Sequence, residues 1–132
     1  MNTYTDSAYA PFKESTIGAL DDKEGYALAL DTDSGTVKLA TGADDSIGFM
    51  KQKLQDGALG NGSINVRLLG KGGTVKVVVG GSIAKGARVK SANGGKVVAA
   101  SPGDRSIGIK LTQGSSSNND VIEILDLVET TP

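Results

Sequence analysis

The stretch Gly35–Met50, GTVKLATGADDSIGFM, aligns without a gap with a second stretch of the same chain, Gly95–Lys110, GKVVAASPGDRSIGIK. Seven of the sixteen aligned pairs are identical, which chance rarely produces: Gly35/Gly95, Val37/Val97, Ala40/Ala100, Asp44/Asp104, Ser46/Ser106, Ile47/Ile107 and Gly48/Gly108. Self-similarity of this kind indicates a duplicated supersecondary unit, in which each copy covers the apolar face of the other. We therefore expect one pseudo-symmetric domain built from two copies.

Alternating apolar residues indicate that both copies consist of β-strands. Runs such as Tyr26/Leu28/Leu30 and Ile107/Ile109/Leu111 have the period of two that is typical of half-buried strands. Between the runs stand Gly- and Asn-rich turn signals, and Gly makes up 19 of the 132 residues. Short strands at this spacing predict an all-β fold, a compact barrel or sandwich.

The same patterns set the expected boundaries. A single β domain covers residues 24–132, with repeat one at about 24–69, a linking strand at 74–80 and repeat two at about 83–128. Helical patterning is limited to two short segments, Met50–Leu59 and Ser15–Leu20. Gly48 and Gly108, each beside an isoleucine, predict strands that a neighbouring backbone or ring approaches closely.

Residues 1–23 show no strand alternation, yet Tyr4, Tyr9 and Phe12 are three of the five aromatic residues of the chain. A segment with large apolar side chains and no pattern of its own predicts an extended N-terminal arm that orders on a partner. The alternative is that these rings close the end of the protein's own barrel.

A run of basic residues lies in the middle of a chain whose net charge is only −1. Between Asp56 and Asp104 there is no acidic residue, but there are seven bases: Arg67, Lys71, Lys76, Lys85, Arg88, Lys90 and Lys96. One interpretation is a face that meets an acidic partner. The other is a solvated strand face that the acidic C-terminal residues balance in three dimensions. The low net charge argues against direct nucleic-acid binding.

The residue inventory excludes most familiar enzyme chemistry. The chain has no Cys and no His, which removes disulfides, thiol nucleophiles, histidine triads and the usual zinc sites. Asp31-Thr-Asp-Ser-Gly35 lacks the remaining ligands of a calcium loop, and the Gly-rich runs match no phosphate-binding pattern. Asp44 and Asp104 are better explained as turn formers than as a catalytic pair. We expect a non-enzymatic protein without metal or cofactor.

Two further absences bear on location. No segment is long and apolar enough to span a bilayer, and the first residues lack the basic start and apolar core of a secretion signal. We therefore expect synthesis in a cytoplasm and no membrane contact.

The order of these motifs resembles the two-repeat capsid cement (head decoration) proteins of tailed bacteriophages. The resemblance covers residues 24–128 and is carried by Asp-x-Gly-x-Val at 33–37, by Ser-Ile-Gly at 46–48 and again at 106–108, and by Val-Val-Val-Gly-Gly-x-Ile-x-x-Gly at 77–86. Where that family usually has a Gly-Glu pair before the strand that ends its first copy, this chain has Asp56-Gly57 and Gly60-Asn61-Gly62.

The resemblance implies a virion structural protein on the capsid exterior, with the major capsid protein as partner and a homotrimer as the favoured assembly. On that basis, the expected partner-binding residues are Tyr4, Tyr9 and Phe12 of the arm together with the seven bases. The alternative is a tail or baseplate component, or a carbohydrate-binding β module. The latter usually displays aromatic platforms, and the expected core offers only Tyr26 and Phe49.

Overall fold

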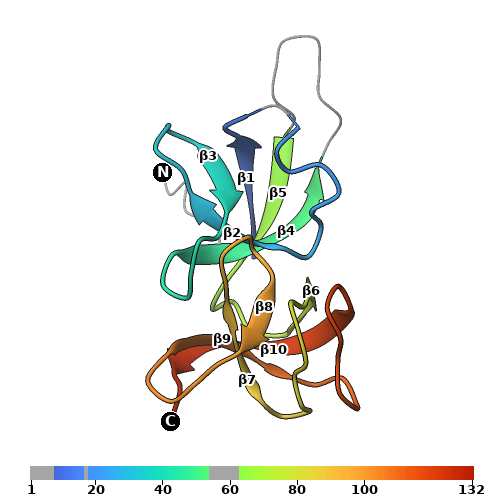
Figure 1. The fold of residues 1–132 in the computed structure, drawn as a ribbon. Helices are drawn as coiled ribbons and strands as arrows, with labels where there is room; N and C mark the ends of the chain where they lie inside the picture. Colours follow the sequence, from blue (N-terminus) through green and yellow to red (C-terminus); the bar gives the residue numbers. More distant parts are fainter. Residues whose placement is uncertain (1–7, 17, 54–62) are drawn as a thin grey trace.

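The computed structural model describes residues 8–16, 18–53 and 63–132, which form strands and turns and contain no helix (Figure 1). The first five strands are β1 (Tyr9–Glu14), β2 (Ala27–Leu30), β3 (Thr36–Leu39), β4 (Ser46–Lys53) and β5 (Ser63–Leu68). The second five are β6 (Thr74–Val78), β7 (Arg88–Ser91), β8 (Val97–Ala99), β9 (Arg105–Lys110) and β10 (Val121–Thr130). The all-β prediction is confirmed, although Met50–Lys53 continue β4 rather than starting a helical turn.

The ten strands form two stacked halves (Figure 1). Strands β1 to β5 make a closed barrel in the order β1-β3-β2-β4-β5, in which β5 pairs back with β1. Strands β6 to β10 make a sheet in the order β6-β10-β9-β7-β8. An isolated parallel bridge between Val79 and Val97 brings the two ends of this sheet together. Among the described residues no helix could cross a membrane.

The two halves use the same pairing scheme. In the first half β2 pairs antiparallel with β3 and β4, and β4 with β5. In the second half β7 pairs antiparallel with β8 and β9, and β9 with β10. Strand β6 pairs with β10 as β1 pairs with β5. The segment expected to link two copies is therefore the first strand of the second half, and its counterpart is β1.

The prediction of an extended N-terminal arm was wrong for residues 9–14, because these residues form barrel strand β1. Its inward positions are Ala10, Phe12 and Glu14, so the apolar alternation is broken by a buried carboxylate. Glu14 is stabilised there because it accepts hydrogen bonds from the backbone N–H groups of Gly18 (2.8 Å) and Leu20 (3.0 Å). Tyr4 lies outside the described residues.

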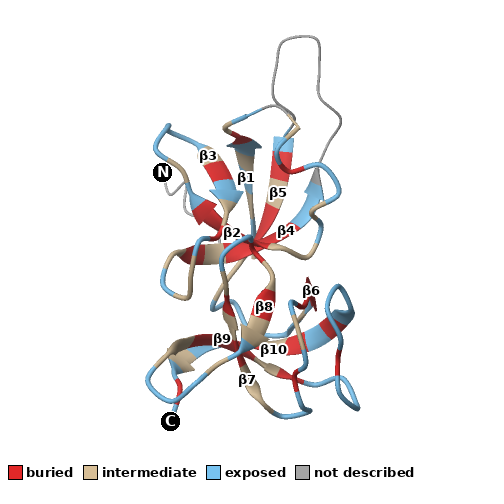
Figure 2. Ribbon diagram, viewed as in Figure 1, coloured by how far each residue is buried: buried red, intermediate tan, exposed pale blue. Residues whose placement is uncertain are grey.

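The apolar core extends across the junction between the halves (Figure 2). One cluster fills the barrel and contains Leu20, Leu28, Val37, Met50, Ile64 and Val66. The other joins Ala27, Ala40 and Phe49 of the first half to residues of the second, among them Val77, Val79, Val97 and Ile107. The two halves therefore pack as one body.

Two buried glycines mark the closest strand contacts. A Cβ atom at Gly48 would lie 2.3 Å from the carbonyl oxygen of Arg67, and one at Gly108 would lie 2.7 Å from that of Leu125. Neither position has room for a side chain, because in each case a backbone oxygen of the neighbouring strand overlaps, together with a side-chain atom of Val66 at Gly48 and of Ile124 at Gly108. Near the second site, the pairing of β9 with β10 shifts register between Asp126 and Glu129.

Candidate functional surface

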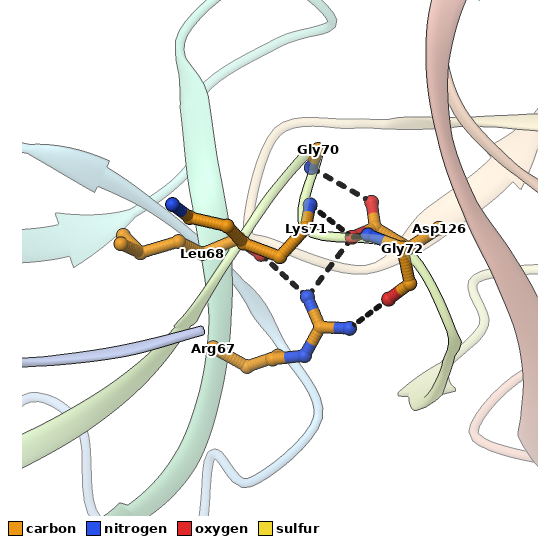
Figure 3. Close-up of polar contacts among 6 residues, drawn as sticks. All are labelled: Arg67, Leu68, Gly70, Lys71, Gly72 and Asp126. Carbon is orange, nitrogen blue, oxygen red and sulfur yellow. Dashed lines mark hydrogen bonds and ion pairs between the residues drawn. The ribbon is translucent and has the colours of Figure 1, made fainter. Parts of the chain in front are cut away.

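The basic residues predicted to meet a partner do not form one continuous face. Arg67 lies inside the molecule, where its guanidinium forms an ion pair with Asp126 at 2.9 Å, and the side chains are 9% and 1% exposed. Arg67 also donates hydrogen bonds to the carbonyl oxygens of Leu68 (2.7 Å) and Gly72 (Figure 3). Its donors are used inside the chain, so Arg67 is part of the junction between the halves.

Asp126 is held by the turn that leads from β5 to β6. Its carboxylate accepts hydrogen bonds from the backbone N–H groups of Gly70 (2.9 Å), Lys71 (2.9 Å) and Gly72 (3.1 Å) (Figure 3). Three successive N–H groups that converge on an anion form a nest. Only the backbone of Lys71 takes part, and its side chain points away from the carboxylate (Figure 3).

Two further bases are paired with acidic residues of the same half. Arg88 binds Glu129, with both side chains a third exposed. Lys90 binds Asp104 at 2.9 Å. The amide oxygens of Asn118 and Asn119 accept hydrogen bonds from Lys96. The acidic C-terminal residues thus balance part of the basic run, as the second interpretation of the sequence expected. Of the seven predicted bases, Lys71, Lys76 and Lys85 are exposed and their ammonium groups have no ion pair among the residues that the structure describes.

Asp104 belongs to a turn that is stabilised by its carboxylate. Hydrogen bonds from the Lys90 ammonium and the Ser101 N–H hold the pKa of Asp104 below its usual value. In the first half the same role falls to Asp45, not to Asp44. Burial raises the pKa of Asp45, but hydrogen bonds from Thr41 and Gly42 outweigh that effect and lower it. Both carboxylates therefore act as turn formers.

The predicted aromatic residues have separate environments. Phe12 is half-buried and packs against the core of the barrel, which favours the alternative that this ring serves the protein's own fold. Tyr9 is 42% exposed and lines an open hollow of about 230 Å³ between the halves. The hollow is lined by Phe49, Met50 and Lys51 of β4 and by Thr74, Val75 and Lys76 of β6. Arg67 and Glu123 complete its lining.

Sequence reasoning did not identify this hollow or the position of Lys51 in it. The residues that line it come from five strands, β1, β4, β5, β6 and β10, and no local pattern brings β4 and β6 together. The described residues hold no group of three or more acidic side chains that could bind a metal ion.

The comparisons with known proteins give a structural match and no sequence match. No protein-family model matches the chain, and neither does any curated protein sequence. Among solved structures, the fold is similar to that of the head fiber gp8.5 N base of bacteriophage phi29. That likeness has a TM-score of 0.58 at 13% sequence identity and covers 90% of this chain and 94% of the other.

Proposed function

We propose that this chain is a non-enzymatic structural protein of a tailed-phage virion, which binds the outer surface of the capsid as a cement protein. The observation that carries the proposal is the shared fold, since the similarity extends over nearly all of this chain and of a phage head fiber base. The motif order described above supports the same class of protein from the sequence.

The physical character of the molecule suits this role. Its buried charged groups are bound inside the molecule, Arg67 by Asp126 and the Lys110 ammonium by backbone carbonyls, and its core is continuous across the junction. A rigid body of this kind can bind a lattice through several modest contacts, because many copies on one shell gain from multivalency. Exposed Lys71, Lys76 and Lys85 supply contacts that steer the molecule toward an acidic surface.

The proposed partner is the major capsid protein, and the proposed assembly is a trimer, as in the proteins that the sequence resembles. Sedimentation velocity of the free protein and cryo-electron microscopy of decorated shells measure the two properties separately. A monomer in solution that forms trimers only on the shell agrees with the proposal. Density inside the shell contradicts it.

The decisive experiment mixes the purified protein with emptied shells of the phage that encodes it. We expect co-sedimentation that saturates at a fixed ratio to the capsid subunit. We also expect binding to weaken in part as salt rises, because exposed charges are screened beyond about 10 Å at 0.1 M. Failure to co-sediment at any salt concentration rejects the proposal, and binding indifferent to salt shows that the lysines do not contribute.

A further inference from the structure

The strand β6 has an open edge that faces the hollow between the halves. In its antiparallel pairing with β10, Asp126 N–H donates to Gly73 C=O and Val79 N–H donates to Asp120 C=O. Because hydrogen bonds on one edge of a strand come from alternate residues, Val75 and Val77 also face β10. The N–H and C=O groups of Thr74 and Lys76 therefore point the opposite way.

Gly25 covers one end of this edge, where it lies against Val78 and beside the carbonyl oxygen of Lys76. Val78, the next residue of the outward set, donates its N–H to the carbonyl oxygen of Gly25 at 3.0 Å. The structure gives the backbone groups of Thr74 and Lys76 no partner among the residues it describes. Both residues are exposed, and both line the hollow.

The corresponding edge of the first half is blocked. Pro11 of β1 lies opposite Asn65 of β5, as Lys76 of β6 lies opposite Glu123 of β10. Proline has no N–H, and it is one of the residues with which proteins protect sheet edges against further pairing. In the first half this edge of β1 is thus paired with β3 at Lys13 and Glu14 and carries a proline at position 11, where β6 presents the N–H of Lys76.

We infer that the open edge of β6 docks an extended segment of a capsid subunit, which pairs with Thr74 and Lys76 as an added strand. Strand addition supplies affinity through main-chain hydrogen bonds, and flanking pockets select the side chains. Val75 is a partly exposed apolar side chain of the lining, whereas Phe49 and Met50, which also line the hollow, are each only 1% exposed. The ammonium groups of Lys51 and Lys76 outnumber the single carboxylate of Glu123 at the rim, so the segment carries an acidic residue beside an apolar one.

This inference rests on the proposed function, and one pair of variants tests it. Lys76→Pro removes the outward N–H, and it places at this position the residue that β1 already has at Pro11. Lys76→Ala removes the same charge and keeps the N–H. We expect Lys76→Pro to bind shells at least about tenfold more weakly than Lys76→Ala, since a lost backbone hydrogen bond leaves its acceptor unsatisfied. Equal binding by the two variants overturns the inference.

The outcome separates the two proposals. If the wild-type protein does not bind shells, the cement function fails and the docking site fails with it. If wild type and Lys76→Pro bind alike, only the docking site is rejected. Should the proline variant unfold, hydrogen–deuterium exchange of the wild type gives the answer. Slower exchange in a peptide covering Thr74–Val78 on shell binding supports strand addition, and unchanged exchange there overturns it.

Discussion

At Asp126 one carboxylate joins β10 to the segment that connects the two halves. The turn around it is possible because Gly70 and Gly72 have φ angles of 78° and 81°, which glycine adopts without steric cost. The Asp126 carboxylate and the Arg67 guanidinium are both buried, and each neutralises the charge of the other. Removing one partner of a buried pair is costly, whereas exposed pairs contribute little.

Asp126→Asn should therefore lower the free energy of unfolding by about 3–5 kcal/mol, because Arg67 keeps its buried charge without a counter-ion. The control is Glu129→Gln, which breaks the half-exposed pair with Arg88 and should cost about 0–1 kcal/mol. Urea denaturation measures both. Similar losses from the two variants contradict the assigned role of Asp126.

Gly108→Ala should destabilise the protein by about 1–3 kcal/mol or more, since the added methyl overlaps a backbone oxygen that cannot move without shifting the strand. Gly81→Ala is the matched control, because a Cβ atom there meets nothing within 4 Å. We expect Gly81→Ala to change the free energy of unfolding, measured by urea denaturation, by no more than about 0.5 kcal/mol. An unchanged free energy of unfolding for Gly108→Ala would contradict the close strand contact at this position.

At the scale of the element, β1 is a strand that the sequence did not predict. The strands of both repeats were predicted from their apolar alternation, and the equivalence of Ser46-Ile-Gly48 with Ser106-Ile-Gly108 placed both glycines against a backbone. In β1 the inward series runs Ala10, Phe12, Glu14. A buried Glu and an edge Pro are each atypical of strands, so no local pattern distinguished this strand from an arm. Only the long-range pairing with β5 defines it.

The surface was predicted less well than the fold. Lys71, Lys76 and Lys85 are among the ten candidates from the sequence, which gave no means of separating these exposed side chains from Arg67, Arg88 and Lys90, whose partners are distant in sequence. Arg67 and Asp126 are 59 residues apart. Pairing across such separations depends on the fold, and composition does not reveal it.

The turn at Ser101–Asp104 has a measurable acid response. The pKa of Asp104 in the folded state lies below its ordinary value of 3.8. The contacts of the carboxylate therefore stabilise the fold above that pH, and the stabilisation is lost as pH falls through the lowered folded-state pKa. As pH is lowered through this acidic range, the melting temperature of Asp104→Asn should fall less steeply than that of the wild type. Asp44→Asn, at an exposed carboxylate, should follow the wild-type curve.

For the whole molecule, the shared core predicts unfolding in a single transition. Phe49→Ala removes a ring that is 1% exposed and packs with residues of the other half. It should cost about 3–5 kcal/mol, and Ile107→Ala about 2–5 kcal/mol. Scanning calorimetry should show one peak in each variant, with the calorimetric and van't Hoff enthalpies equal. Two resolved peaks would show that the halves unfold independently.

Phe49, Ala27 and Ala40 lie among residues of the other half, and this limits how the chain can change during evolution. A deletion that removed either half would leave the survivor with an uncovered apolar surface and a tendency to aggregate. We therefore expect selection against loss of either half at the turn between Leu69 and Thr74. Insertions and deletions among descendants should accumulate instead at the outer turns, which the junction does not use.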